Sequence, residues 1–231
     1  MTRLFKKLKR LITGQFLSKY RSELNYWKEK YIEEGYRFEN GFYRKNMLGI
    51  AQEIDDAFLH DKIVVDFGCG PRGSLVWTDA PGLKIGVDVL ADKYFDSFAT
   101  EMARHNCLYI KSSEKRIPMP DDYVDVVFTL NSMDHTDNFE AMLDEIFRVL
   151  KKGGEFIGSF NMNERWTPSE PQRLTFEMIE ELLFPKLDLR HKLITFREGE
   201  KTYTKFVEYE VGKRNRGEVC ILCVRGRKLA L

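Results

Sequence analysis

The chain has 231 residues, of which 43% are hydrophobic, 13% aromatic and 32% charged. This composition excludes a mostly disordered chain, a collagen-like repeat and a small disulfide-stapled protein. No uninterrupted apolar run reaches the roughly 18 residues that a membrane-spanning helix needs, so we expect no such helix.

Charge is unevenly distributed, although the net charge is only +1. Residues 1–21 carry seven Lys and Arg and no acidic residue, which leaves the rest of the chain at −6. An acidic body has no general attraction for nucleic acid, so a nucleic-acid partner is not favoured.

The first 57 residues are predicted to form a basic amphipathic leader and a helical cap, with residues 58–231 as a separate domain. In residues 3–12, Leu4, Phe5, Leu8, Leu11 and Ile12 lie on one side of a helix and Lys and Arg on the other. One interpretation is peripheral contact of residues 1–20 with an anionic membrane. The other is a cap that packs on its own domain and leaves its basic face in water.

The remaining chain alternates between strand and helix patterns. Short apolar runs predict strands at 62–67, 83–88, 107–110, 123–130 and 155–160, with helices over 91–105 and 139–150. After a helix near 175–184, β-rich stretches at 191–196, 203–211 and 218–224 have short connectors, which favours antiparallel pairing. We therefore predict an α/β doubly wound, mostly parallel seven-stranded sheet with an antiparallel C-terminal edge.

Four cysteines are present, and two of them form the pair Cys220-Ile-Leu-Cys223. This pair lies within a predicted strand, where residues three apart point to opposite faces, so it is not a metal or redox pair. Buried, reduced thiols are typical of a cytoplasmic protein.

A glycine-rich loop, Asp66-Phe-Gly-Cys-Gly-Pro-Arg-Gly73, follows the first strand. Gly68 and Gly70 allow a sharp turn and close approach to a ligand, and Pro71 suits the first turn of a following helix. Asp88 ends the second strand, where a carboxylate can accept hydrogen bonds from two ribose hydroxyls. With Gly73 these residues also match the dinucleotide fingerprint, so an NAD-dependent oxidoreductase is one alternative. However, Asp66 would lie beside a pyrophosphate, and its charge suits a cationic ligand better.

Further motifs follow in order: Pro118-x-Pro-Asp-Asp-Tyr-Val-Asp-Val-Val127 and Glu145-Ile-Phe-Arg-Val-Leu-Lys-Lys-Gly-Gly154. Together with the glycine loop and Asp88, they resemble the class I S-adenosylmethionine-dependent methyltransferases of the methyltransferase-11 type over residues 55–165. The resemblance implies S-adenosyl-L-methionine as cofactor, with its methionyl end at the glycine loop, its ribose at Asp88 and its adenine after the third strand. The cofactor-binding residues that it implies are Asp66, Gly68, Gly70, Gly73, Asp88, Ser113, Glu114, Asn131 and Ser132.

The segment 130–138 follows the fourth strand, where this family's cofactor pocket meets the acceptor site. His135 is the candidate general base and Asp134 its candidate orienting residue. Alternatively, Asp134 or Asn138 caps the next helix and His135 packs beside the adenine. No full ligand set is evident, so we expect no metal.

The predicted reaction is in-line methyl transfer, with O-methylation of a small-molecule or saccharide- or lipid-linked acceptor. Weak similarity to transferases of surface-glycan and lipid-linked saccharide pathways suggests that acceptor class. A non-catalytic cofactor-binding module is a further alternative. The predicted location is cytoplasmic, with or without peripheral membrane contact.

Overall fold

The computed structural model describes residues 19–167, 169–198, 202–212 and 219–230. The predicted basic leader therefore lies almost wholly outside the described residues. In the described part of the chain, no helix is both long and apolar enough to cross a membrane.

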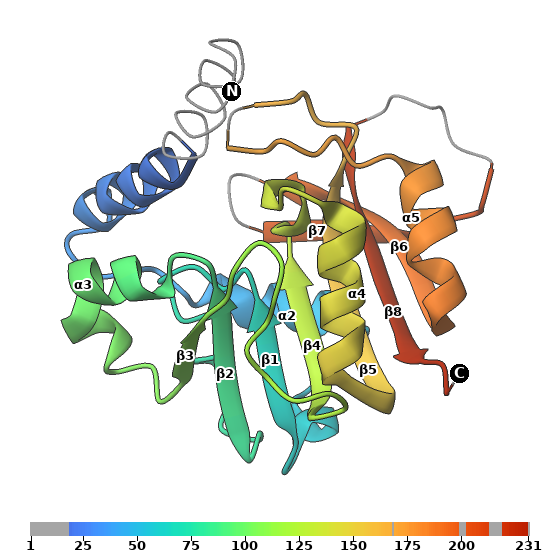
Figure 1. The fold of residues 1–231 in the computed structure, drawn as a ribbon, viewed down its shortest axis with the longest axis horizontal. Helices are drawn as coiled ribbons and strands as arrows, with labels where there is room; N and C mark the ends of the chain where they lie inside the picture. Colours follow the sequence, from blue (N-terminus) through green and yellow to red (C-terminus); the bar gives the residue numbers. More distant parts are fainter. Residues whose placement is uncertain (1–18, 168, 199–201, 213–218, 231) are drawn as a thin grey trace, which may run out of the picture.

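One mixed sheet of eight strands organises the fold, in the order β3-β2-β1-β4-β5-β8-β6-β7 (Figure 1). Its strands are β1 (Ile63–Phe67), β2 (Leu83–Asp88), β3 (Leu108–Lys111), β4 (Val124–Leu130), β5 (Leu150–Met162), β6 (Leu187–Glu198), β7 (Thr202–Glu208) and β8 (Cys220–Lys228). The first five strands pair in parallel, and β8 lies antiparallel between β5 and β6. The predicted fold class is confirmed, but the predicted count of seven strands is one too low, because all three C-terminal stretches join the sheet.

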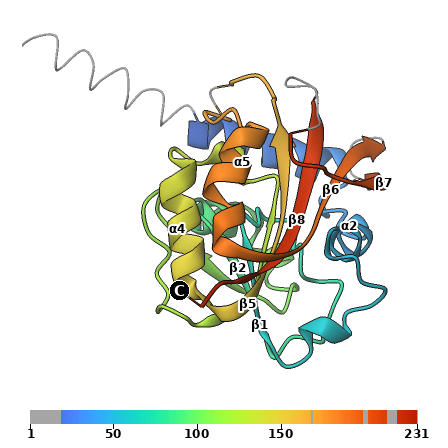
Figure 2. The ribbon, with the colours of Figure 1, turned by 90° about the vertical axis from the view of Figure 1, so that its right-hand side faces the viewer.

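Helices cover both faces of the sheet (Figure 2). They are α2 (Phe42–Ala51), α3 (Ala91–Met102), α4 (Phe139–Val149) and α5 (Phe176–Leu182), together with a helix over residues 19–33, which we call the cap helix. The α4 and α5 helices pack on one face, and α2 packs on the other with Met47 and Ile50 fully buried. The cap helix and α3 share a third cluster around Phe38 and Phe98.

Local sequence explains where the α4 and α5 helices begin. Asn138 caps α4 by accepting a hydrogen bond from the Ala141 N–H (3.0 Å), and Thr175 caps α5 in the same way at Met178 (3.3 Å). The capping alternative for Asn138 is thus confirmed. The α4 helix ends at Val149, and the chain passes directly into β5 at Leu150.

The connection between β1 and β2 departs from the prediction. Residues 68–82, all of them described, form turns and no helix, so Pro71 does not begin one. The glycine loop must therefore be held by something other than a helix of its own.

The two cysteines of β8 are buried, and they belong to different core clusters. Cys220 packs on the α4–α5 side and Cys223 on the α2 side. The prediction that this pair is neither a metal nor a redox pair is consistent with this placement on opposite faces of one strand.

Candidate active site

A cavity of about 600 Å³ opens at the carboxyl ends of the parallel strands, beside the cap helix. Its wall is formed by the loops after β1, β2, β3, β4 and β5 and by the cap helix. Seven of the residues predicted from the sequence line it: Gly68, Gly70, Asp88, Glu114, Asn131, Ser132 and His135. The other four, Asp66, Gly73, Ser113 and Asp134, lie outside the wall.

The glycine loop is tightly enclosed by its neighbours. Gly68 has a φ of +71°, and a Cβ there would collide with the side chain of Ser132. Gly70 has a φ of +56°, and a Cβ would lie 2.9 Å from the ring of Trp27 in the cap helix. Both positions therefore require glycine for conformation and for space.

Arg72 fixes this loop to the cap segment. Its buried guanidinium pairs with Glu34 at 2.5 Å, donates to the main-chain oxygen of Glu39 at 2.7 Å, and lies over the ring of Trp27. These contacts replace the expected helix as the support of the loop. Gly73, with a φ of +75°, packs against Val76 and His105 away from the cavity; its role is therefore in loop packing.

Asp88 stands at the end of β2 on the cavity wall. Its carboxylate accepts hydrogen bonds from the N–H groups of Gly70 (3.1 Å) and Leu90 (2.9 Å). Burial raises the pKa of Asp88 to about 6, against the effect of these two donors. The carboxylate therefore joins the glycine loop to the β2 end and remains next to the space where a ligand would bind.

Asp66 lies beneath the loop and not on the cavity wall. One carboxylate oxygen accepts a hydrogen bond from the Ser74 hydroxyl, and Oδ1 is buried with no hydrogen-bond partner among the described residues. Burial raises the pKa of Asp66 to about 7, with a smaller contribution from the charge of Asp88. An acid in this state stabilises the fold while protonated and weakens it once ionised.

We expect Asp66→Asn to change how stability depends on pH. The folded-state pKa of about 7 lies above the ordinary aspartate value of 3.8, so the native state binds the proton more tightly and stability falls as pH rises between these values. The variant should be more stable than the parent by about 1–3 kcal/mol at pH 8 and gain nothing near pH 4. Urea unfolding at both pH values measures this, with the exposed Asp61→Asn as control. An equal gain at both pH values would contradict it.

The loop after β3 places Ser112 on the cavity wall, one residue before the predicted Ser113. Because β3 extends to Lys111, the N–H of Ser112 pairs with the main-chain oxygen of Asp88 at 3.1 Å. Ser113 is exposed, and its hydroxyl accepts from the Arg116 N–H at 3.0 Å. The serine of this loop that lines the cavity is therefore Ser112, and the adenine contact of Ser113 stays a prediction.

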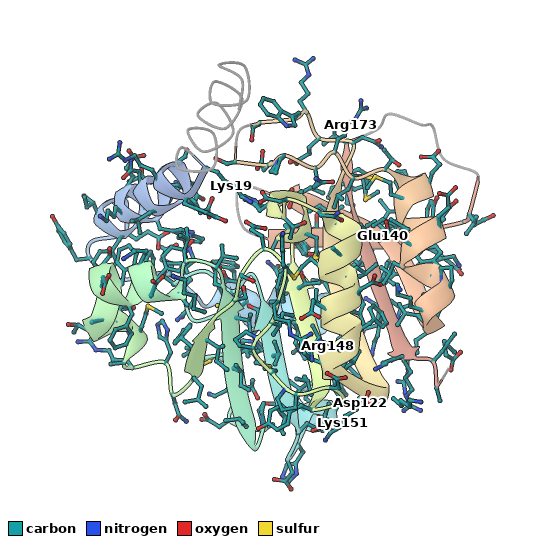
Figure 3. All side chains as sticks on the ribbon, in the orientation of Figure 1. Lys19, Asp122, Glu140, Arg148, Lys151 and Arg173 are labelled. Carbon is teal, nitrogen blue, oxygen red and sulfur yellow. The ribbon has the colours of Figure 1, made fainter. Side chains whose placement is uncertain are left out.

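Glu114 lies on the wall but is held by other protein groups. Its carboxylate accepts hydrogen bonds from Lys19 Nζ (2.8 Å), Tyr20 Oη (2.8 Å) and the Asp137 N–H (3.1 Å). Lys19, at the start of the described cap helix, is directed at the body of the molecule and also pairs with the Asp137 carboxylate at 2.9 Å (Figure 3). Glu114 thus anchors the cap helix at this end of the cavity.

His135 projects into the cavity between two carboxylates. Its Nδ1 lies 3.7 Å from Glu23 Oε2 of the cap helix, and its Nε2 lies 3.9 Å from Glu170 Oε1 in the loop after β5. Asp134 has another partner: its buried carboxylate accepts a hydrogen bond from Asn161 Nδ2 at 3.2 Å. Among the described residues, the carboxylates within 4 Å of the His135 ring nitrogens are therefore those of Glu23 and Glu170 and not that of the predicted Asp134.

Asn131 is positioned by the C-terminal hairpin, which sequence reasoning missed. Its backbone is left-handed, with a φ of +47°, and its amide donates to the hydroxyl of Tyr203 in β7. Ser159 in β5 donates to the Asn131 side-chain oxygen at 3.2 Å. Asparagine adopts this conformation more readily than most non-glycine residues, and these two partners fix its side chain.

Asp134, His135 and Glu170 each place one possible ligand atom within 4.8 Å of the others. One oxygen of Asp134 is already used by Asn161, so the group offers fewer donors than a hard divalent cation usually takes. The expectation that the protein uses no metal stays a prediction.

No signal local to residues 130–138 could have revealed Glu23, Glu170 or Tyr203, because they come from distant segments.

Comparison with known proteins identifies a domain. Residues 65–158 match the family model described as a methyltransferase domain, and this range contains the glycine loop, Asp88 and His135. The chain therefore contains a methyltransferase domain over these residues. It is 26% identical over 142 residues to an uncharacterized methyltransferase, YcgJ, of Bacillus subtilis, covering 60% of this chain and 54% of that protein. It is also 30% identical over 107 residues to a fatty-acid O-methyltransferase of Mycolicibacterium smegmatis, covering 44% and 38% of the two chains.

The chain spans about half, or less, of the length of these curated relatives. Among solved structures, its fold resembles the putative methyltransferase in a complex with the Haloferax volcanii Trm112 methyltransferase activator. The TM-score is 0.62 at 16% identity, with 89% of this chain and 97% of that chain covered. At this identity the likeness is one of fold.

The residues present fit the family's cofactor, S-adenosyl-L-methionine. Gly68 and Gly70 line the cavity, and Asp88 supplies a carboxylate at its wall. The unpartnered oxygen of Asp66 beneath the loop adds negative charge where a cationic methionyl group would lie. The roles of these residues in the methyltransferase remain predictions.

Proposed function

We propose that this chain methylates a hydroxyl group of a small-molecule acceptor, one that is free, saccharide-like or lipid-linked. The observation that supports this most is one cavity whose wall contains the glycine loop, Asp88 and the His135 ring. When bound there, S-adenosyl-L-methionine would supply a methyl group on a cationic sulfur.

The protein's own residues would bind, orient and deprotonate. The glycine loop and Asp88 would hold the donor beside the acceptor hydroxyl, so that proximity would supply much of the rate. The donor would supply its methyl group to the acceptor oxygen and leave as the neutral thioether. His135 lies on the cavity wall and would accept the hydroxyl proton as a general base.

A nicotinamide-dependent oxidoreductase is less consistent with the charge of the loop. Asp66 lies beneath the glycine loop and Asp88 beside it, where a pyrophosphate would add more negative charge. The loop is also not followed by a helix whose N-terminus could bind phosphate. The partly exposed His135 ring on the cavity wall favours a catalytic role over a non-catalytic one.

Peripheral membrane contact and a cytoplasmic location also belong to this proposal. Residues 1–18 lie outside the described part of the chain, and Lys19 is buried in ion pairs with Glu114 and Asp137. Contact of the predicted leader, residues 1–20, with anionic lipid would therefore come from the basic residues that precede Lys19. Sedimentation with anionic vesicles, comparing the full chain with one that lacks residues 1–18, measures it.

Cofactor binding is tested first, with the full chain. We expect S-adenosylhomocysteine to bind in calorimetry and NADH not to bind, and Asp88→Ala to weaken the binding at least about tenfold through loss of charge-assisted hydrogen bonds. Asp92→Ala is the control. Asp92 lies outside the cavity wall, and its carboxylate pairs with Lys111 Nζ at 2.6 Å. Equal affinity of the Asp88→Ala variant and the parent would remove the assigned ribose contact.

Methyl transfer is tested next, with labelled S-adenosyl-L-methionine and a panel of monosaccharides, polyprenols, fatty acids and primary amines. We expect label in a hydroxyl-bearing acceptor, and we expect His135→Ala to lower the rate by about 10²–10⁴ without changing cofactor affinity. His60→Ala is the matched control, because His60 is exposed and lies outside the cavity wall. Transfer only to amines, or an unchanged rate in His135→Ala, would contradict the proposed reaction.

A further inference from the structure

We propose that Glu23 of the cap helix is the positioning residue for His135. It would hold the imidazole with the proton on Nδ1 and leave Nε2 free to accept a proton from the acceptor. The use made of Nε2 rests on the proposed function, whereas the state of the ring can be tested without it.

The carboxylate of Glu23 is held at one oxygen and directed at His135 with the other. Oε1 accepts a hydrogen bond from the Trp27 indole N–H at 2.8 Å, one helical turn further along the cap helix. Oε2 lies 3.7 Å from His135 Nδ1, with both side chains about a quarter to a third exposed. The first contact fixes the direction of the second.

Trp27 is itself immobilised by the glycine loop. Its ring lies beneath the buried guanidinium of Arg72, with 5.4 Å between the guanidinium carbon and the ring centre, and packs edge-on against Phe38 at 5.9 Å. The close approach of Gly70 to the same ring removes the remaining space. A continuous set of packed groups therefore joins the loop that binds the donor to the carboxylate that faces the base.

A second carboxylate competes for the ring from the opposite side. Glu170 Oε1 lies 3.9 Å from Nε2, and its other oxygen accepts a hydrogen bond from the Thr167 hydroxyl at 2.9 Å. The nearby carboxylates of Asp134 and Asp88 add to the negative surroundings of the ring. Glu23 and Glu170 favour opposite tautomers, since a carboxylate stabilises the N–H that points towards it.

Geometry favours Glu23 in this competition. It is nearer to the ring, and it lies on a helix locked by Trp27 and Arg72, whereas Glu170 lies on the irregular loop between β5 and α5. With Nδ1 protonated, Nε2 faces the gap towards Glu170. An acceptor hydroxyl in that gap would donate its proton to Nε2 while Glu170 accepts a hydrogen bond from a neighbouring donor group.

Nitrogen NMR of the full-length protein, labelled with ¹⁵N-histidine, reports the tautomer directly. The chain has only 4 histidines, and the His135→Asn variant assigns the signal. At a pH where the rings are neutral, we expect His135 to be mainly the Nδ1–H tautomer. Glu23→Gln should shift the tautomer ratio at least about threefold towards Nε2–H, because the variant lacks the negative charge that stabilises the Nδ1–H group. Glu23→Asp should restore most of the parental ratio, because the charge is kept.

Glu29→Gln is the matched control, because it removes the same charge from an exposed position of the same helix. A parental ring that is mainly Nε2–H, or equal ratios in Glu23→Gln and Glu29→Gln, would overturn the proposal. Trp27→Phe removes the donor but keeps the charge, and it should give a smaller shift in the same direction. None of these measurements uses cofactor or acceptor, so a failure of methyl transfer and a failure of this proposal are separate results.

Discussion

Replacing Gly68 by alanine is expected to prevent cofactor binding and to lower the melting temperature by roughly 5–15 °C, for a chain of this size. A Cβ at this position would collide with the Ser132 side chain, which is held in place by Thr129 Oγ1 at 2.8 Å and the main-chain oxygen of Phe67 at 2.9 Å. The left-handed backbone, with a φ of +71°, adds its own cost of about 1–2 kcal/mol for any residue with a Cβ. Overpacking adds about 1–3 kcal/mol.

Gly153→Ala separates these two costs. Gly153 has nearly the same backbone, with a φ of +73°, but a Cβ there would meet no atom within 4 Å. It should lose about 1–2 kcal/mol through backbone strain alone and retain full affinity for S-adenosylhomocysteine. Equal melting temperatures and equal affinities for S-adenosylhomocysteine in Gly68→Ala and Gly153→Ala would show that the contact with Ser132 does not shape the loop.

Arg225→Met is expected to destabilise the protein strongly, with a loss of about 3–5 kcal/mol. The Arg225 guanidinium is 4% exposed; it pairs with Glu155 at 2.6 Å and donates to the main-chain oxygen of Ala51 at 2.5 Å. It therefore joins β8, β5 and the end of α2. Without it, a carboxylate that is 7% exposed keeps only the distant Arg190 and Arg227 at 3.6 and 3.9 Å.

The pKa of Glu155 provides a second measure of the same loss. Burial pushes this pKa up, but hydrogen bonds and charge from Arg225 outweigh burial and hold the pKa below its usual value. Such a carboxyl contributes stability above its unfolded pKa and loses it as pH falls through the lowered folded pKa. In Arg225→Met the pKa should rise, so the deficit measured by urea unfolding should be largest at neutral pH and smaller in acid. Arg227→Met, about half exposed, is the control and should lose less than about 1 kcal/mol.

Much of the fold follows from local pattern. The nearly continuous apolar run of β1 and the amphipathic pattern of α4 place these elements almost to the residue, because burial on two faces or on one stripe leaves a distinct signature. The left-handed backbone of Gly68 and Gly70 also follows from the local sequence, because the predicted sharp turn needs it. The loop Pro71-Arg72-Gly73 was mispredicted because its residues suit a helix start, while the actual contacts of Arg72 are with Glu34 and Glu39.

The site was predictable only where it belongs to one strand end. Asp88 and Asn131 follow buried strands, so their place at the cavity could be expected. Glu23 and Tyr203 could not, because the chain brings them to His135 and Asn131 from opposite ends of the sequence. Single-sequence pattern carries no information on such pairings, which depend on how the cap helix and the β6–β7 hairpin dock.

Because the connection between β1 and β2 contains no helix, its shape depends on the N-terminal residues that contact it. In a domain whose donor loop leads into its own helix, the loop would keep its shape when outlying segments are removed. Here residues 68–82 form no helix, and the ion pair and ring contacts of Arg72 come from residues 27–42. A fragment beginning at β1 would lack these contacts of Arg72 and also α2, so it would not keep a preformed glycine loop. Recognition modules that replaced the N-terminal segment would have to supply their own clamp for Arg72.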